Sequence, residues 1–184
     1  MNALRVLACA ALAVALALTV PSAWLPSARA AAADAQDFLG QYRDWYAYRL
    51  REGGNRTCYM VSKPIRSRGG VKQRGDVVAF VTHRPKEDER DVINFQAGYT
   101  YKPKSTVTVT IKDRSFSLFT TNDSAWARNV DDERAMIEAM INGITMEVKG
   151  MSVRGVETID TYSLRGFTAA HKRITGACGL TPVS

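Results

Sequence analysis

Alternation between hydrophobic and polar residues is the main pattern of this chain after residue 44. It is clearest where Val107, Val109 and Ile111 alternate with threonines, because a period of two places one set of side chains on each face of a strand. Other runs typical of strands and bounded by turn-forming residues, including a compact apolar run at 77–82, lie at 45–50, 57–61, 77–82, 92–101, 115–120, 144–149 and 157–164. Together they predict about eight antiparallel strands, the first two paired as a hairpin across a Gly-Gly-Asn turn.

Two segments show the period of a helix instead. The first carries an apolar stripe and predicts a helix over 131–142, begun by Asp131 or Asp132 and ended by Gly143 in a left-handed conformation. The second predicts a helix over 166–177, whose buried face has four members, Phe167, His171, Ile174 and Cys178. The strands and helices predict a mostly β fold, an antiparallel β-sandwich with two short helices packed on it.

The first thirty residues have the three parts of a secretory signal peptide. Arg5 provides the positive start, residues 6–20 carry no charge, and small residues lead to a cleavage site near Ala30. As a helix, the uncharged run reaches about 22 Å at roughly 1.5 Å per residue, which is short for a hydrocarbon core of about 30 Å. We therefore expect cleavage rather than a membrane anchor, then a loose N-terminal segment over 31–43 and one domain over 44–180.

Export determines the compartment in which the domain works. The mature protein is expected in the periplasm, at the outer membrane or outside the cell, either soluble or in peripheral contact with a membrane. Two cysteines remain after the signal is removed, and thiols in an oxidising compartment most simply pair with each other. The sequence therefore predicts a disulfide between Cys58 and Cys178, which would join the start of the domain to its end.

The chain has a net charge of +7, with 25 basic and 18 acidic residues. A basic exported protein can adsorb to an anionic surface such as lipopolysaccharide or a host glycan, whereas its compartment and its scattered charges argue against nucleic acid. Positive charge is densest in the loop over 63–76, where four residues are candidates for such a contact: Arg66, Arg68, Lys72 and Arg74. The alternative is that these residues only keep an exposed loop solvated.

Residues that could support catalysis or metal binding are few. His83 and His171 are the only histidines, and a zinc site needs three or four converging ligands, so we expect no metal and no cofactor. His171 lies on the buried face of the second helix and His83 follows a strand, which favours structural roles for both. No Gly-x-Ser-x-Gly motif is present. The remaining enzymatic hypothesis is a periplasmic hydrolase in which His83 or His171 meets a nucleophile or a carboxylate.

Five segments, read in order, resemble the invasion-associated locus B family of alphaproteobacterial envelope proteins. They are THRP at 82–85, AWA at 125–127, MEVKG at 146–150, RG at 154–155 and DTYSLRGFTAA at 160–170. The similarity extends from about Trp45 to Cys178, and the last segment is its most specific part. It implies an exported, β-rich, single-domain protein of the periplasm or outer membrane, which in some pathogenic members contributes to entry into host cells. The family has no established active site, so the resemblance implies no catalytic residue.

These observations predict a non-catalytic envelope protein with a binding or scaffolding role, and a contribution to host-cell invasion in a pathogen. Its partner would be another envelope protein or an anionic surface. An exposed aromatic patch would favour a protein or glycan partner. Four aromatic residues are expected in the core or in a patch at its edge: Trp45, Tyr46, Tyr48 and Trp126. Nothing in the sequence indicates an oligomeric state.

Overall fold

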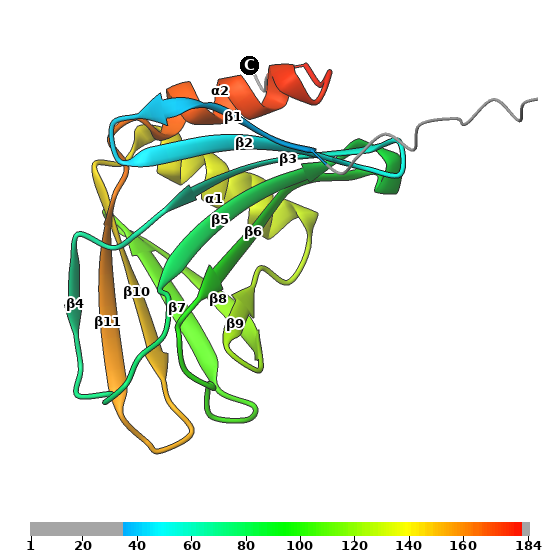
Figure 1. Cartoon of the computed structure of the whole chain (residues 1–184). Helices are drawn as coiled ribbons and strands as arrows, with labels where there is room; N and C mark the ends of the chain where they lie inside the picture. Colours follow the sequence, from blue (N-terminus) through cyan, green and yellow to red (C-terminus); the bar gives the residue numbers. More distant parts are fainter. Residues whose placement is uncertain (1–34, 182–184) are drawn as a thin grey trace, which may run out of the picture. The chain divides into compact units, whose positions relative to one another are not determined.

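The computed structural model of the protein describes residues 35–181, and the predicted signal peptide lies outside the described residues. Within them, eleven strands form one antiparallel sheet and two α-helices pack against it (Figure 1). The prediction of a mostly β, antiparallel fold with two short helices is therefore confirmed.

The strands are β1 (Ala35–Tyr42), β2 (Trp45–Glu52), β3 (Asn55–Ser62), β4 (Arg66–Arg68), β5 (Val78–Arg84), β6 (Glu89–Gln96), β7 (Thr106–Ile111), β8 (Arg114–Thr121), β9 (Ser124–Trp126), β10 (Thr145–Met151) and β11 (Glu157–Ser163). The helices are the single 3-10 turn η1 (Pro85–Glu87), α1 (Val130–Asn142) and α2 (Phe167–Ala177). Along the sheet the order is β1-β2-β3-β5-β6-β9-β8-β7-β10-β11-β4, so β1 and β4 are its edges.

Three strands, β1, β4 and β9, are additional to the eight that the sequence predicts. β1 corrects the expectation of a loose segment over 31–43, because it pairs with β2 from Ala35 to Tyr42. Its register shifts between Phe38 and Gly40, and this irregularity interrupts the alternation by which a strand is recognised. β4 and β9 have three residues each, too few to show an alternating pattern.

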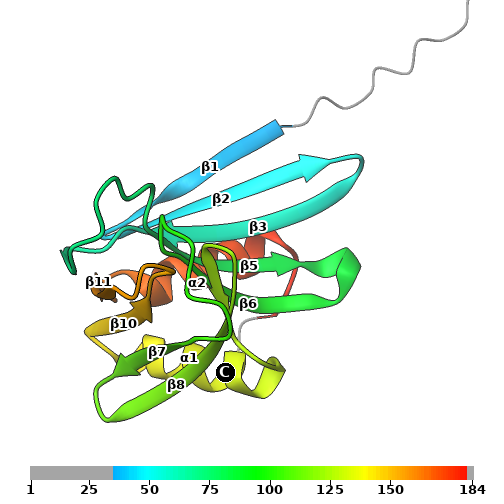
Figure 2. The same cartoon turned by 90° about the horizontal axis from the view of Figure 1, so that it is seen from below.

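The sheet is continuous rather than divided into the two separate sheets of a sandwich. Pairing is unbroken through its middle, where β9 joins β6 on one side and β8 on the other. The sheet nevertheless curves until its halves face each other, and Phe95 on β6 packs against Tyr162 on β11 with ring centroids 6.0 Å apart. Figure 2 shows β1 to β3 and β7 to β8 on opposite sides of the domain. The core lies between the halves, as it would between the layers of a sandwich.

The helix α2 covers the face of the first hairpin that carries Trp45. This side chain is fully buried and meets Phe167 of α2 edge to face, with ring centroids 5.0 Å apart. Its indole Nε1 donates to the carbonyl of Ser163 at 3.0 Å, which links β2 to the end of β11. Gly166 precedes the helix with a φ of +89°, and an added Cβ would overlap the backbone carbonyl of Tyr42. Only glycine fits this approach of the helix to β1.

The helix α1 packs beside β6, and both of its ends differ from the sequence expectation. It is capped by Asn129, whose Oδ1 accepts the backbone N–H of Asp132 at 2.9 Å, and not by Asp131 or Asp132. Gly143 is extended, with a φ of −92°, and not left-handed. A Cβ there would collide with Leu164, so space rather than conformation requires this glycine. Four side chains of α1 are buried: Met136, Ile137, Ala139 and Met140.

Candidate functional site

The predicted disulfide is present and attaches the end of α2 to the sheet. Cys58 of β3 and Cys178, directly after α2, are bonded with their Cα atoms 5.8 Å apart. Cys58 is the cross-strand neighbour of His83 on β5. The bond therefore lies beside one of the two histidines of the chain.

His83 and His171 come together with Asp91, although they belong to β5 and α2. Nε2 of His171 and Oδ1 of Asp91 are 2.6 Å apart, and the two imidazole rings lie edge to face with centroids 5.6 Å apart. All three residues are buried. The sequence argument against a metal site assumes that the histidines do not converge, and this assumption is wrong. They converge because α2 folds back across the start of the sheet, which no local pattern reveals.

Hydrogen bonds define which nitrogen of His83 carries the proton. Its Nδ1 accepts the backbone N–H of Asp91 at 3.1 Å, so the proton of the neutral ring lies on Nε2. Nε2 then donates to Oγ1 of Thr175 at 3.1 Å, while the Thr175 hydroxyl donates to the carbonyl of His171 at 2.7 Å. Both ring nitrogens of His83 are thus satisfied without a charge on the ring.

The electrostatics of the cluster agree with this assignment. Burial lowers the pKa of His83 to about 4, and the nearby carboxylate of Asp91 offsets this only in part. Burial raises the pKa of Asp91, but the hydrogen bond from His171 and the nearby positive charge of Arg90 help to outweigh it, so the pKa lies below its usual value. Arg90 Nε also donates to Asp91 Oδ2 at 3.2 Å. At neutral pH His83 is therefore uncharged and Asp91 is ionised.

Thr175, His83 and Asp91 form a chain of contacts like that of a nucleophile, a base and an acid, but two features oppose catalysis. In a catalytic triad the histidine accepts the proton of the nucleophile, whereas His83 Nε2 already carries a proton and donates it to Thr175. Thr175 and His83 are also 0% exposed, so a substrate does not reach this hydroxyl. The arrangement is suited to joining β5 and β6 to α2, or to holding an ion.

Three of the four predicted surface-binding residues are exposed. Arg66 and Arg68 lie on the edge strand β4, and Arg68 is paired with Glu147 at 3.3 Å. Lys72 lies in the loop that follows β4 and is also exposed. These three remain available to a large anionic partner, with Arg68 partly neutralised.

Arg74 points inward and does not belong to that surface. Its guanidinium forms a bidentate ion pair with the carboxylate of Asp160 on β11, and its Nε donates to the carbonyl of Ala97 at 2.6 Å. The guanidinium also lies over the ring of Tyr99, 5.1 Å from its centroid. The side chain thus attaches the loop to the sheet, a role that its sequence neighbourhood does not indicate.

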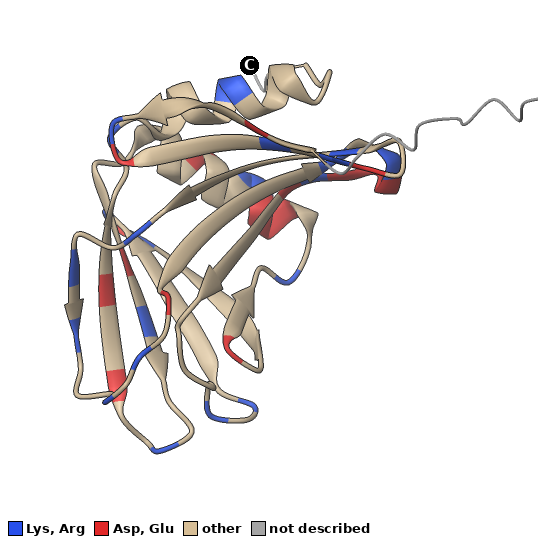
Figure 3. Ribbon diagram, viewed as in Figure 1, with Lys and Arg blue, Asp and Glu red and all other residues tan. Residues whose placement is uncertain are grey.

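Other basic residues, not identified from the sequence, lie near Lys72. Two backbone hydrogen bonds of 2.9 Å join the loop between β6 and β7 to the end of β10 and to the turn that follows it. A hollow of about 430 Å³ separates these segments from the loop of Lys72. Figure 3 shows positive charge on all three loops at this end of the sheet. We call four residues the basic end: Lys72, Lys102, Lys104 and Arg154. All are exposed, and none forms an ion pair within residues 35–181.

Each member of the basic end lies between two strands that the sequence predicts. What the sequence does not show is that these turns meet, because their proximity depends on the order of strands in the sheet.

Comparison with known protein families identifies the family of this chain. The model of the family described as Invasion associated locus B (IalB) protein matches residues 45–175. The chain belongs to this family. No curated protein and no solved structure matched it.

Membership of the IalB family confirms the resemblance found in the sequence and makes this an invasion-associated envelope protein at the level of the family. The match begins at the start of β2 and ends within α2, so it includes the histidine cluster and the basic end. In the part of the chain that the structure describes, no helix is both long and apolar enough to cross a membrane.

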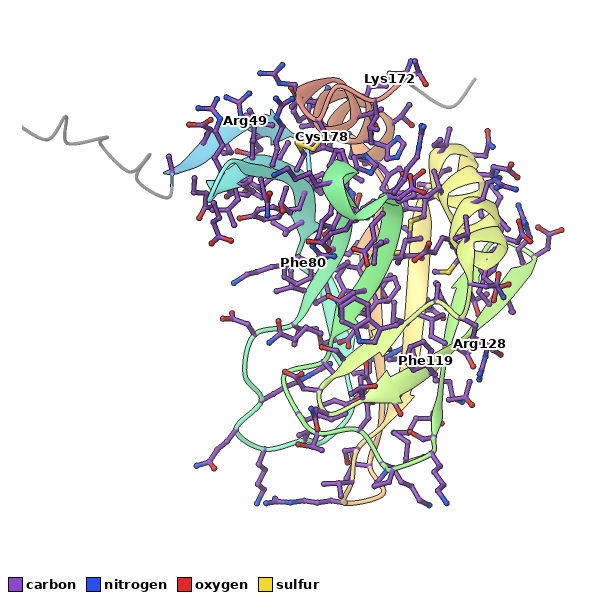
Figure 4. The ribbon with its side chains drawn as sticks, turned by 90° about the vertical axis from the view of Figure 1, so that its right-hand side faces the viewer. Arg49, Phe80, Phe119, Arg128, Lys172 and Cys178 are labelled. Atoms are coloured by element: carbon purple, nitrogen blue, oxygen red, sulfur yellow. A yellow bond between two sulfur atoms is a disulfide. The ribbon has the colours of Figure 1, made fainter. Side chains whose placement is uncertain are left out.

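The IalB domain also carries aromatic residues on the sheet face opposite α2. Three rings lie side by side across β1, β2 and β3: Phe38 is tilted against Tyr48 with centroids 5.4 Å apart, and Tyr48 stacks on Tyr59 with centroids 5.2 Å apart. Cross-strand pairing continues this face through Phe80, Trp126 and Phe119, two of which are labelled in Figure 4. Of the aromatic residues considered in the sequence, only Trp45 lies in the core, while Tyr46 is 37% exposed. An aromatic face of this kind is typical of a surface that contacts protein or glycan.

Proposed function

We propose that this IalB-family protein is a non-catalytic binding protein of the cell envelope that attaches to an anionic surface through its basic end. The observation that supports this most directly is the exposure of Lys72, Lys102, Lys104 and Arg154 on three adjacent loops. Within the described residues no carboxylate pairs with them. Cations gathered in this way attract polyanions and can form charge-assisted hydrogen bonds with phosphate or sulfate groups.

The proposal requires export. The uncharged run over 6–20 and the small residues before Ala30 support a signal peptide that is cleaved after Ala30. The intact mass of protein recovered from the periplasm tests this step, and a chain beginning at residue 31 is expected. A product that retains Met1 would contradict it.

Binding to vesicles tests the anionic surface. The protein is expected to co-sediment with vesicles of phosphatidylglycerol and not with vesicles of phosphatidylcholine, and to dissociate as salt rises from about 50 to about 500 mM, because exposed charges are screened. Lipopolysaccharide and heparin replace the vesicles in parallel experiments and distinguish an envelope surface from a host glycan. Replacing all four residues of the basic end by Gln should abolish the salt-sensitive binding.

A second fourfold variant provides a matched control, because it removes the same charge elsewhere. Its exposed positions are Lys86, Arg128, Lys172 and Arg173, each replaced by Gln. This control is expected to bind the anionic surface nearly as well as the unmodified protein. If both variants lost binding to the same extent, net charge alone would determine binding. If both variants bound as well as the unmodified protein, the proposal would be contradicted.

The alternative of a periplasmic hydrolase has one observation in its favour, the contact of His83 with Thr175 and Asp91. The buried hydroxyl and the proton on His83 Nε2 weigh against it. We therefore propose no catalytic role for His83 or His171. Any hydrolytic activity of the purified protein that Thr175→Val abolishes, with the fold intact, would reverse this conclusion.

A further inference from the structure

The cluster beneath α2 directs three metal-ligating atoms toward one another. Nδ1 of His83, Oδ1 of Asp91 and Nε2 of His171 all lie within 4.8 Å of one another. Oδ1 is 3.8 Å from Nδ1 and 2.6 Å from Nε2. Ligands of a tetrahedral zinc ion lie about 2.0–2.2 Å from the metal, which places them roughly 3.3 Å from each other. We propose that His83, Asp91 and His171 form a binding site for one divalent cation of the zinc class.

The protonation of the cluster is compatible with an ion in this position. The proton of His83 lies on Nε2, so His83 can bind an ion through Nδ1 without a change of tautomer, once the lone pair of Nδ1 is released from the backbone N–H of Asp91. Between His171 Nε2 and Asp91 Oδ1 there is a single hydrogen-bonding proton. The ion takes the place of this proton. The N–H bond at Nε2 of His171 breaks and its proton leaves to solvent, while Nδ1 of the same ring keeps a proton or takes one up from solvent, so that a neutral imidazole binds the metal through Nε2. The Asp91 backbone N–H gives up its hydrogen bond to His83 Nδ1, which is the cost of binding.

The residues around the cluster provide the support that metal ligands require. His83 Nε2 donates to Thr175 Oγ1 at 3.1 Å, which fixes the orientation of that ring. The second oxygen of Asp91 accepts from Arg90 Nε at 3.2 Å, which leaves the first oxygen for the ion. The His171 ring stacks on Phe167, with centroids 5.9 Å apart. All three ligands are therefore oriented by groups that do not themselves bind the metal.

The ligand set and its access determine which ions fit. Two imidazole nitrogens and one carboxylate suit zinc, cobalt, nickel or copper, whereas calcium and magnesium prefer oxygen ligands. A cleft of about 330 Å³ between α1 and α2 is lined by Asp91, Arg134, Glu138 and Lys172, and Figure 4 shows Lys172 on α2 at the top of the molecule. This cleft gives an ion a path from solvent to the carboxylate, and a water molecule can complete the coordination.

Nitrogen-detected imidazole spectra test the site directly, because the chain has only two histidines. The protein is labelled with ¹⁵N and purified without a histidine tag, and Zn²⁺ is added to one equivalent. Nδ1 of His83 and Nε2 of His171 are expected to shift, while Nε2 of His83 keeps its proton. Ca²⁺ and Mg²⁺ should cause no shift. Unchanged imidazole signals at about tenfold excess of Zn²⁺, or loss of the proton from Nε2 of His83, would overturn the proposal.

Replacement of the carboxylate provides the second test. Asp91 has a φ of +60°, a conformation that Asn tolerates well, so Asp91→Asn keeps the backbone and removes the anionic ligand. Zn²⁺ affinity, measured by calorimetry, is expected to fall at least about tenfold. Asp88→Asn is the matched control, because Asp88 has a φ of +56° in the same hairpin and is exposed. Thermal unfolding without metal confirms that both variants are folded, and equal Zn²⁺ affinity in both would reject the site.

Discussion

At the scale of single residues, Arg74 and Asp160 form the ion pair that attaches the loop before β5 to β11. Their side chains are 14% and 5% exposed. Removing one partner of such a buried pair leaves the other charge without compensation in a poorly solvated site. The position of Lys72, two residues before Arg74, depends on this pair. The basic end is therefore held by an arginine that is not itself available to a ligand.

Replacement of Arg74 by Met is expected to lower the free energy of unfolding by about 3–5 kcal/mol, because Asp160 stays buried without a partner. Urea denaturation measures the loss. Arg66→Met is the control: Arg66 is exposed, and the expected change is within about 0.5 kcal/mol. The double variant Arg74→Met/Asp160→Leu should recover part of the stability, since no unpaired charge remains. A single-variant loss no larger than that of the control would contradict the role of the pair.

At the scale of helices and strands, local patterns predict the elements that local interactions control. Both helices, and eight of the eleven strands, follow from the sequence. β4 and β9 form because partner strands present open edges to them, and a three-residue segment carries no signal of that. The basic end and the histidine cluster depend on the order of strands and on where α2 packs. For this reason the sequence analysis did not identify Asp91 as a member of the cluster.

The helix α1 makes a pH-dependent contribution through Glu133. Burial raises the pKa of Glu133 to about 7, and the backbone N–H of Ile93 opposes this only in part. The folded state therefore holds the proton to higher pH than the unfolded chain, so this stability is complete below about pH 4.5 and is lost as the pH rises through about 7. Glu133→Gln is expected to unfold like the unmodified protein at pH 5 and to be about 1 kcal/mol more stable at pH 8, after allowance for solvent screening. Denaturant titrations across this range measure the difference.

The matched control for Glu133 lies on the same helix. Glu138 is exposed, so Glu138→Gln should leave the pH dependence of unfolding unchanged. If the Glu133→Gln variant followed the same pH profile as the unmodified protein, the buried carboxyl would not be the source of the effect.

At the scale of the whole molecule, the beginning and the end of the described chain pack against each other. The helix α2 lies against β1, β2 and β3, and the disulfide adds a covalent link between β3 and the residue that follows α2. The sequence predicts this bond because only two cysteines remain in the expected mature chain. It does not predict that the bond and the histidine cluster lie side by side, which follows from the pairing of Cys58 with His83 across β3 and β5.

The length of chain that this disulfide encloses indicates its effect on stability. The two cysteines are 120 residues apart, and restriction of so long a loop in the unfolded chain stabilises the fold by about 5 kcal/mol at most. The double variant Cys58→Ala/Cys178→Ala is therefore expected to lose about 3–5 kcal/mol of unfolding free energy in urea. Addition of dithiothreitol should lower the stability of the unmodified protein to a similar level and leave the variant unchanged, which separates loss of the bond from loss of the two side chains. A variant within about 1 kcal/mol of the oxidised protein would mean that the packing of α2, rather than the bond, joins the two ends of the domain.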